Sequence, residues 1–144
     1  MTICIIPARS GSKRIKNKNV KIFNNKPLIY YSINLAKRSK LFSRIIVTTD
    51  SKKIANMSKK FGAEVPFLRE KKFSNDHATT FSALKDCYDK LNLKSKYFFC
   101  IYPTAPLLKV NDIKKAYKKI KKIKYNGLIA TCKYSSSPLR AFIK

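Results

Sequence analysis

Short apolar runs alternate with longer amphipathic segments along the chain. The run Ile3–Ile6 predicts a strand that is buried on both faces. Similar runs predict strands over residues 45–49, 65–68, 97–101 and 127–132. Pro66 makes the third of these the weakest, an edge strand or the start of a strand.

The segments between these runs have a helical period. Pro27 opens a helix with one apolar face, made of Leu28, Tyr31, Ser32, Leu35 and Ala36. The same period predicts helices over residues 51–61, 80–91 and 111–120, the second of them with Phe81 facing inward.

Polar residues mark the ends of the later helices. The predicted N-caps are Asp50 or Ser51, then Thr79 or Thr80, then Asn111. Gly62 supplies a C-terminal stop.

Strands that alternate with helices predict a mostly parallel sheet covered on both faces. We therefore expect a Rossmann-like, three-layer α/β fold. Residues 1–144 contain no repeat, low-complexity tract or linker, which indicates one domain. Sites in such sheets lie beyond the carboxyl ends of the strands, which selects the loops 9–26, 69–80 and 102–109.

The charge is strongly basic, with 33 Lys and Arg against 7 Asp and Glu, a net charge of +26. This raises the expectation of a polyanionic partner. Lysine far outnumbers arginine, however, and accompanies many Ile and Asn residues, as in proteins encoded by AT-rich genomes. A basic nucleic-acid-binding domain stays an alternative, but it needs exposed aromatics among the cations, whereas Tyr and Phe here follow the predicted core pattern. We expect no specific nucleic-acid partner.

The cysteines Cys4, Cys87, Cys100 and Cys132 form no CxxC pair, and His77 has no Cys neighbour. We therefore expect buried thiols rather than a zinc site. No apolar stretch approaches the roughly 18 residues of a membrane helix, and the N-terminus lacks the features of a signal peptide. These observations predict a cytoplasmic protein without a membrane partner.

The loop after the first strand is rich in candidate anion ligands. It contains neither GxGxxG nor GxxxxGK[ST]. Gly11 nevertheless allows a close backbone approach, and Arg9 and Lys13 suit phosphate oxygens. The loop is thus a candidate nucleoside triphosphate site, and a merely solvated basic loop is the alternative.

The strings IIPARSGSKRIKNKN and NKPLIYYSI resemble the N-terminal signature of the acylneuraminate cytidylyltransferase family. The resemblance continues through IIVTTD, FLREKKFSNDHATT and CIYPTAPL, and so spans nearly the whole chain. The segments around Arg69 and Tyr102 are most similar to pseudaminic acid cytidylyltransferases, whereas sialic acid enzymes usually carry Gln in place of Tyr102. The fold implied is that of the nucleotide-diphospho-sugar transferases.

On the phosphate side, the resemblance implies that Arg9, Ser12 and Lys13 hold the triphosphate of CTP. Lys18 and Asn19 would close over the phosphates and the base. Arg9 and Lys18 are the implied catalytic residues, since cations at these positions can stabilise charge on the α-phosphate and the leaving pyrophosphate.

On the base side, the resemblance implies that Arg69, Ala78 and Thr80 surround the cytosine and ribose. Tyr102 matches a position that faces the sugar. Each residue also has a simpler interpretation: a surface arginine, a packing contact, a helix cap and a strand-end aromatic, respectively. Asp50 suggests a metal ligand, but helix capping is the interpretation that we favour for it.

The implied reaction transfers CMP from CTP to the anomeric hydroxyl of pseudaminic or sialic acid and releases pyrophosphate. Mg²⁺ is the implied cofactor, with no metal ligand assigned within the chain. The family's metal-binding aspartates and dimerisation extension occur in a later segment. We therefore expect an N-terminal portion that is inactive alone, taken from a homodimeric enzyme. An enzyme of similar fold for another sugar, such as Kdo, is a further alternative, although YPTAP differs from the Gly-Asp-rich turn expected there.

Overall fold

The computed structural model describes residues 2–122, 126–131 and 133. Its central sheet contains β1 (Ile3–Pro7), β4 (Arg44–Thr48) and β5 (Phe98–Cys100) in the order β4-β1-β5. Both pairings are parallel, with Ile3 opposite Arg44 on one side and Phe98 on the other. The predicted parallel sheet is confirmed, and its carboxyl ends meet at one edge.

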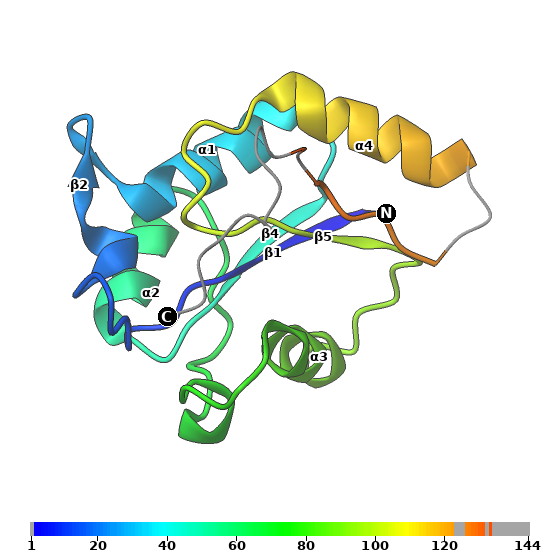
Figure 1. The fold of residues 1–144 in the computed structure, drawn as a ribbon. Helices are drawn as coiled ribbons and strands as arrows, with labels where there is room; N and C mark the ends of the chain where they lie inside the picture. Colours follow the sequence, from blue (N-terminus) through cyan, green and yellow to red (C-terminus); the bar gives the residue numbers. More distant parts are fainter. Residues whose placement is uncertain (1, 123–125, 132, 134–144) are drawn as a thin grey trace, which may run out of the picture.

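In the described part of the chain, four helices cover this sheet in two layers: α1 (Leu28–Ser39), α2 (Lys52–Lys60), α3 (Thr80–Lys90) and α4 (Val110–Lys122). Figure 1 shows α1 and α4 on one side of the sheet and α3 on the other. Alternate residues of β1 serve the two layers. Cys4 and Ile6 belong to the cluster with α1, α2 and α4, whereas Ile3 and Ile5 pack with α3. The three-layer α/β architecture is therefore confirmed.

The remaining elements lie in the connections. Two short 3-10 helices, η1 (Lys18–Val20) and η2 (Lys71–Phe73), lie in the predicted site loops. A small antiparallel pair, β2 (Ile22–Phe23) with β3 (Lys26–Pro27), leads into α1.

Two predicted strands are not formed as expected. The segment 64–68 makes only isolated parallel bridges, Glu64 with Ile46 of β4 and Leu68 with Thr49, the residue after β4. Pro66 lies between these bridges and has no N–H to donate, so a continuous ladder cannot form there. Residues 127–131 are exposed and in no strand, while the last residue of that prediction, Cys132, lies outside the described residues.

The apolar faces of two helices differ in detail from the predicted ones. In α1, Ile29 and Ile33 are fully buried, whereas Leu28 and Tyr31 are half-buried. In α3 the inward prediction for Phe81 is wrong: its side chain is 73% exposed. It lies in the first turn, before the residues of α3 that pack against β1.

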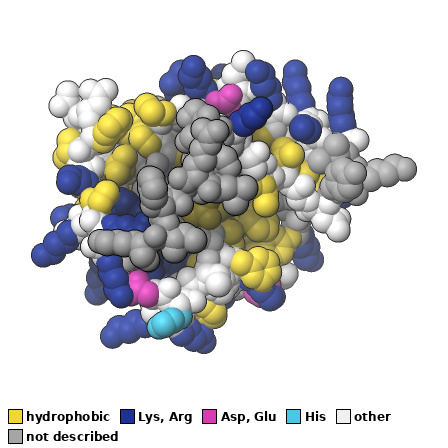
Figure 2. Space-filling model, viewed as in Figure 1, with side chains coloured by type: hydrophobic (Ala, Val, Ile, Leu, Met, Phe, Trp, Pro, Cys, Tyr) yellow, Lys and Arg dark blue, Asp and Glu magenta, His cyan; other side chains and the backbone are white. Residues whose placement is uncertain are grey.

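The described cysteines agree with the expected thiols. Cys4 and Cys87 are buried, Cys100 is half-buried, and all three are free, while Cys132 lies outside the described residues. No described helix is long and apolar enough to cross a bilayer. In Figure 2 the Lys and Arg side chains are spread around the rim of the visible face, with hydrophobic side chains between them. The cations on this face do not form one continuous block.

Candidate active site

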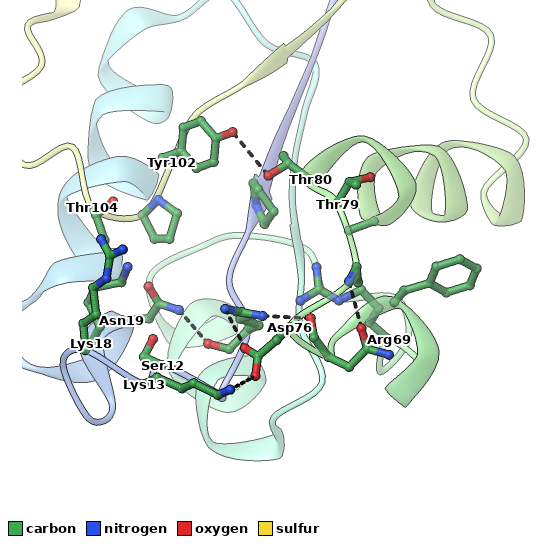
Figure 3. Close-up of a pocket in the computed structure, with 18 of the residues that line it drawn as sticks. Ser12, Lys13, Lys18, Asn19, Arg69, Asp76, Thr79, Thr80, Tyr102 and Thr104 are labelled. Carbon is green, nitrogen blue, oxygen red and sulfur yellow. Dashed lines mark hydrogen bonds and ion pairs between the residues drawn. The ribbon is translucent and has the colours of Figure 1, made fainter. Parts of the chain in front are cut away.

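A cavity of about 590 Å³ opens at the carboxyl edge of the sheet. All three predicted loops contribute to its wall. So do all nine residues assigned to a site from the sequence: Arg9, Ser12, Lys13, Lys18, Asn19, Arg69, Ala78, Thr80 and Tyr102. The structure therefore brings these residues together, although their individual roles remain predictions. Figure 3 labels seven of them, which converge from η1 and the loop before it, from the segment 69–80 that leads into α3, and from the loop after β5.

The loop after β1 forms the basic side of the cavity. Arg9 lies two residues after the end of β1, and one of its Nη atoms donates to the backbone oxygen of Asn75 at 2.8 Å. Its other Nη atom lies 3.2 Å from Asp76, and Lys13 Nζ lies 2.7 Å from the second oxygen of the same carboxylate. Two of the predicted phosphate ligands thus share one acidic partner.

Lys18 and Asn19 come from η1. Asn19 is buried, and its Nδ2 donates to the backbone oxygen of Arg9 at 2.8 Å. Asn19 lines the cavity, and its buried Oδ1 has no hydrogen-bond partner among the described residues. Lys18 is half-buried and forms no ion pair with any described residue, which leaves its ammonium group free for a ligand.

Arg69 stands on the opposite wall and is only 5% exposed. Its Nε donates to Ser74 Oγ at 2.9 Å, and its backbone N–H donates to the oxygen of Thr49. Burial lowers the pKa of the guanidinium below its ordinary value, while the nearby Asp50 carboxylate opposes that shift. The position is buried and anchored, which contradicts the simpler interpretation as a surface arginine.

Thr80 and Tyr102 meet across the cavity. The Tyr102 hydroxyl donates to Thr80 Oγ1 at 3.3 Å, and the backbone oxygen of Tyr102 accepts from Ser32 Oγ. The N-cap of α3 is Thr79, whose Oγ1 accepts from the Ser82 N–H. Thr80 is therefore not the helix cap, and its hydroxyl faces the cavity with Tyr102 (Figure 3).

The capping interpretation of Asp50 is wrong. Ser51 caps α2 by accepting from the Ile54 N–H, and the Asp50 carboxylate accepts two hydrogen bonds from Ser10 instead. Asp and Ser are both good caps, so two adjacent candidates cannot be separated by residue type.

The sequence analysis gives no functional role to two further residues of the loop 69–80, Asn75 and Asp76. Asn75 Oδ1 accepts from the N–H groups of His77 and Ala78, which shapes the loop below the base side of the cavity. The available signal was an asparagine in a polar loop, since Asn commonly bonds its own downstream backbone in turns.

The described residues do not form a metal site. No group of three or more His, Cys, Asp or Glu residues is placed to hold an ion in the described part of the chain. Asp76, the acidic residue of the cavity wall, is paired with Arg9 and Lys13. These donors do not fit a Mg²⁺ ion, which prefers several oxygen ligands.

Comparisons with known proteins identify the family of the chain. The chain is 39% identical over 143 residues to the pseudaminic acid cytidylyltransferase of Campylobacter jejuni subsp. jejuni serotype O:23/36 (strain 81-176), covering 97% of this chain and 62% of that protein. It is 32% identical to the CMP-N,N'-diacetyllegionaminic acid synthase of Legionella pneumophila subsp. pneumophila, covering 94% of this chain and 60% of that protein. The chain thus spans about three fifths of the length of these relatives.

A solved structure with the same fold is that of a CMP:2-keto-3-deoxy-manno-octonic acid synthetase in complex with CTP. It matches with a TM-score of 0.73 at 20% identity, over 84% of this chain and 47% of that one. At this identity the likeness establishes the fold alone. The sequence itself matches the cytidylyltransferase family over residues 3–140. On this match and the identity to its relatives, the chain belongs to the cytidylyltransferase family.

Proposed function

We propose that this chain carries the CTP site of an enzyme that transfers CMP to an acidic nine-carbon sugar. In the reaction, the anomeric hydroxyl oxygen of the sugar bonds to the α-phosphorus of CTP. The bond from that phosphorus to the oxygen bridging to the β-phosphate breaks, pyrophosphate leaves, and the hydroxyl proton is released. The observation that carries the proposal is one cavity with a basic loop on one side and a buried arginine and two hydroxyls on the other.

The basic side suits the triphosphate. Arg9 offers a planar fork and Lys13 a mobile ammonium group, both strong donors to phosphate oxygens. Lys18, which is unpaired among the described residues, is the cation we assign to the charge that develops on the α-phosphate and pyrophosphate. Ser12 adds a hydroxyl from the same loop.

The opposite wall suits the nucleoside. Arg69 and Thr80 offer donors to the cytosine and ribose, and Ala78 leaves room for the base. Asn19 lines the cavity from η1, and we assign it, with Lys18, to close over the phosphates and the base.

The choice of sugar rests on the relatives and on charge. The two relatives named above are a pseudaminic acid cytidylyltransferase and a CMP-N,N'-diacetyllegionaminic acid synthase. A sugar carboxylate is compatible with a cavity whose wall carries more cations than anions. We assign Tyr102, which is 52% exposed at the cavity wall, to the sugar side.

Mg²⁺ usually accompanies a nucleoside triphosphate. Because the described residues do not fit the ion, we propose that it enters on the phosphate oxygens of CTP itself. No step described above depends on it. What these residues supply is positioning and neutralisation of charge.

Backbone NMR tests this division of the cavity. CTP should shift the amide signals of Ser12, Lys13, Ala78 and Thr80, and an acidic nine-carbon sugar added afterwards should shift that of Tyr102. The matched controls are a neutral hexose and CTP-free titrations with the same sugar. If CTP shifted other amide signals but none of those of Ser12, Lys13, Ala78 and Thr80, the proposal would be contradicted.

A further inference from the structure

We propose that Asp50 is a positioning residue that holds the phosphate loop in place from behind the cavity. The inference rests on the proposed function, since it concerns the same triphosphate site. Asp50 is absent from the residues that line the cavity, so it acts through Ser10 rather than by touching the nucleotide.

The grip on Ser10 uses both carboxylate oxygens. Oδ1 accepts from the Ser10 backbone N–H at 2.8 Å, and Oδ2 accepts from Ser10 Oγ at 2.6 Å. A two-point contact to a carboxylate fixes orientation as well as distance. Ser10 lies between Arg9 and Ser12, and its backbone oxygen accepts from the Ser12 N–H at 3.0 Å. The two hydrogen bonds from Ser10 to Asp50 therefore fix the turn that carries the predicted phosphate ligands Arg9, Ser12 and Lys13.

The sheet explains why Asp50 can reach this loop. Strands β1 and β4 pair in parallel, with Pro7 opposite Thr48, and the Ala8 N–H donates to the Thr48 oxygen at 3.0 Å. The backbone segments that follow β1 and β4 therefore leave the same edge of the sheet side by side. Ser10 and Asp50 each come two residues after this hydrogen-bonded pair, Ala8 and Thr48. Because Ser51 caps α2, the Asp50 side chain is free to serve the neighbouring loop.

Asp50 also acts on the other wall. The Arg69 backbone N–H donates to the backbone oxygen of Thr49 at 2.8 Å, and Thr49 is the residue before Asp50. The Asp50 carboxylate favours the charged form of Arg69 and raises its pKa against the effect of burial. The geometric case for Asp50 therefore rests on its two hydrogen bonds to Ser10 in the phosphate loop, and its charge also favours the ionised form of Arg69.

The sign of the effect on anion binding separates positioning from simple electrostatics. A carboxylate near a triphosphate repels it, so removing the charge alone should tighten binding. If Asp50 positions the loop, removing it should weaken binding instead, because Arg9 and Lys13 lose their fixed geometry.

The test compares Asp50→Ala, Asp50→Asn and Ser10→Ala with the unmodified chain and with Asp89→Asn. The last variant removes one exposed carboxylate from α3, away from the cavity, and controls for net charge. Calorimetry measures the Kd of CTP, CMP and inorganic tripolyphosphate, and thermal unfolding measures the folded state of each variant.

We expect Asp50→Ala to weaken CTP and tripolyphosphate about tenfold or more, the scale of a lost hydrogen bond to a charged group. CMP should weaken less, so that the ratio of the CMP and CTP Kd values falls. Asp50→Asn keeps the shape and should recover part of the loss, and Asp89→Asn should match the unmodified chain. A general loss of structure would instead weaken CMP and CTP equally.

Anion binding by Asp50→Ala that is equal to or tighter than that of the unmodified chain would overturn the inference. If Asp50→Ala does not fold, the binding of tripolyphosphate by Ser10→Ala tests the inference instead. This variant removes one of the two hydrogen bonds and leaves Asp50 in place, so it should also bind the anion more weakly. Tripolyphosphate keeps the two proposals apart. An unmodified chain that binds tripolyphosphate but not CTP contradicts the proposed function, while the effect of Asp50 on the loop is still measured.

Discussion

Lys13 Nζ lies 2.7 Å from a carboxylate oxygen of Asp76, whose other oxygen pairs with Arg9. The Asp76 carboxylate therefore pairs with both cations, Arg9 and Lys13, that we assign to the triphosphate. The hydrogen bond from Lys13 holds the pKa of the Asp76 carboxyl below its ordinary value. A carboxyl with a lowered pKa stays ionised at neutral pH, and its contact is lost only as the pH falls through that lowered value.

We predict that Asp76→Asn strengthens the binding of tripolyphosphate, because the variant frees Lys13 and Arg9 from an internal competitor. Exposed ion pairs contribute about 0–1 kcal/mol, so the gain should be about two- to fivefold. Calorimetry at pH 7.5 measures it. Glu64→Gln is the control, since it breaks a comparable pair with Arg44 outside the cavity wall. Weaker binding by Asp76→Asn would show that Asp76 orients the cations rather than competing for them.

Lys13 and Lys16 offer a matched pair within one loop. Lys13 lines the cavity, whereas Lys16 is exposed and does not. Lys13→Ala should cost about 1.5–3 kcal/mol of CTP binding, the scale of a hydrogen bond to a charged group, and Lys16→Ala should cost far less. Both variants should unfold at the temperature of the unmodified chain. If a CTP titration showed that both variants lose the same binding free energy, the loop would act only through its overall positive charge and Lys13 would have no specific role.

Arg69 should affect both stability and base choice. Arg69→Ala removes the bond to Ser74 Oγ and opens space beside a buried position, so the free energy of unfolding should fall by about 1–3 kcal/mol. It should also remove the preference for CTP over UTP. Ser74→Ala is the control, because it loses the same bond but keeps the guanidinium. Urea unfolding and nucleotide titrations check the two effects, and an unchanged preference in Arg69→Ala would exclude Arg69 from the base site.

The location of the site could be predicted from the sequence because two constraints agree. Parallel strands bring their carboxyl ends to one edge, and the ordered motifs from Arg9 to Tyr102 assign residues to the loops at that edge. The roles of Asp50 and Asp76 could not be predicted. Each depends on a contact between segments distant in the chain, Asp50 with Ser10 and Asp76 with Lys13, and no local pattern encodes such contacts.

The errors in the fold have similar causes. Residues 65–68 have a strand-like composition, but Pro66 interrupts the ladder with β4. Phe81 has the helical spacing of a core residue, yet it lies in a turn of α3 that is not covered. Periodicity gives the direction of a side chain, and tertiary packing decides whether anything lies there.

Nucleotide choice is the most direct test of the central claim that the cavity is a CTP site. Calorimetric titrations of the unmodified chain with CTP, UTP, ATP and GTP should be made under one set of salt and Mg²⁺ conditions. Cytosine-specific hydrogen bonds predict that CTP binds at least about tenfold more tightly than the other three, with the preference lost in Arg69→Ala. Equal affinities for all four nucleotides would contradict the account and leave a general anion site in the loop after β1.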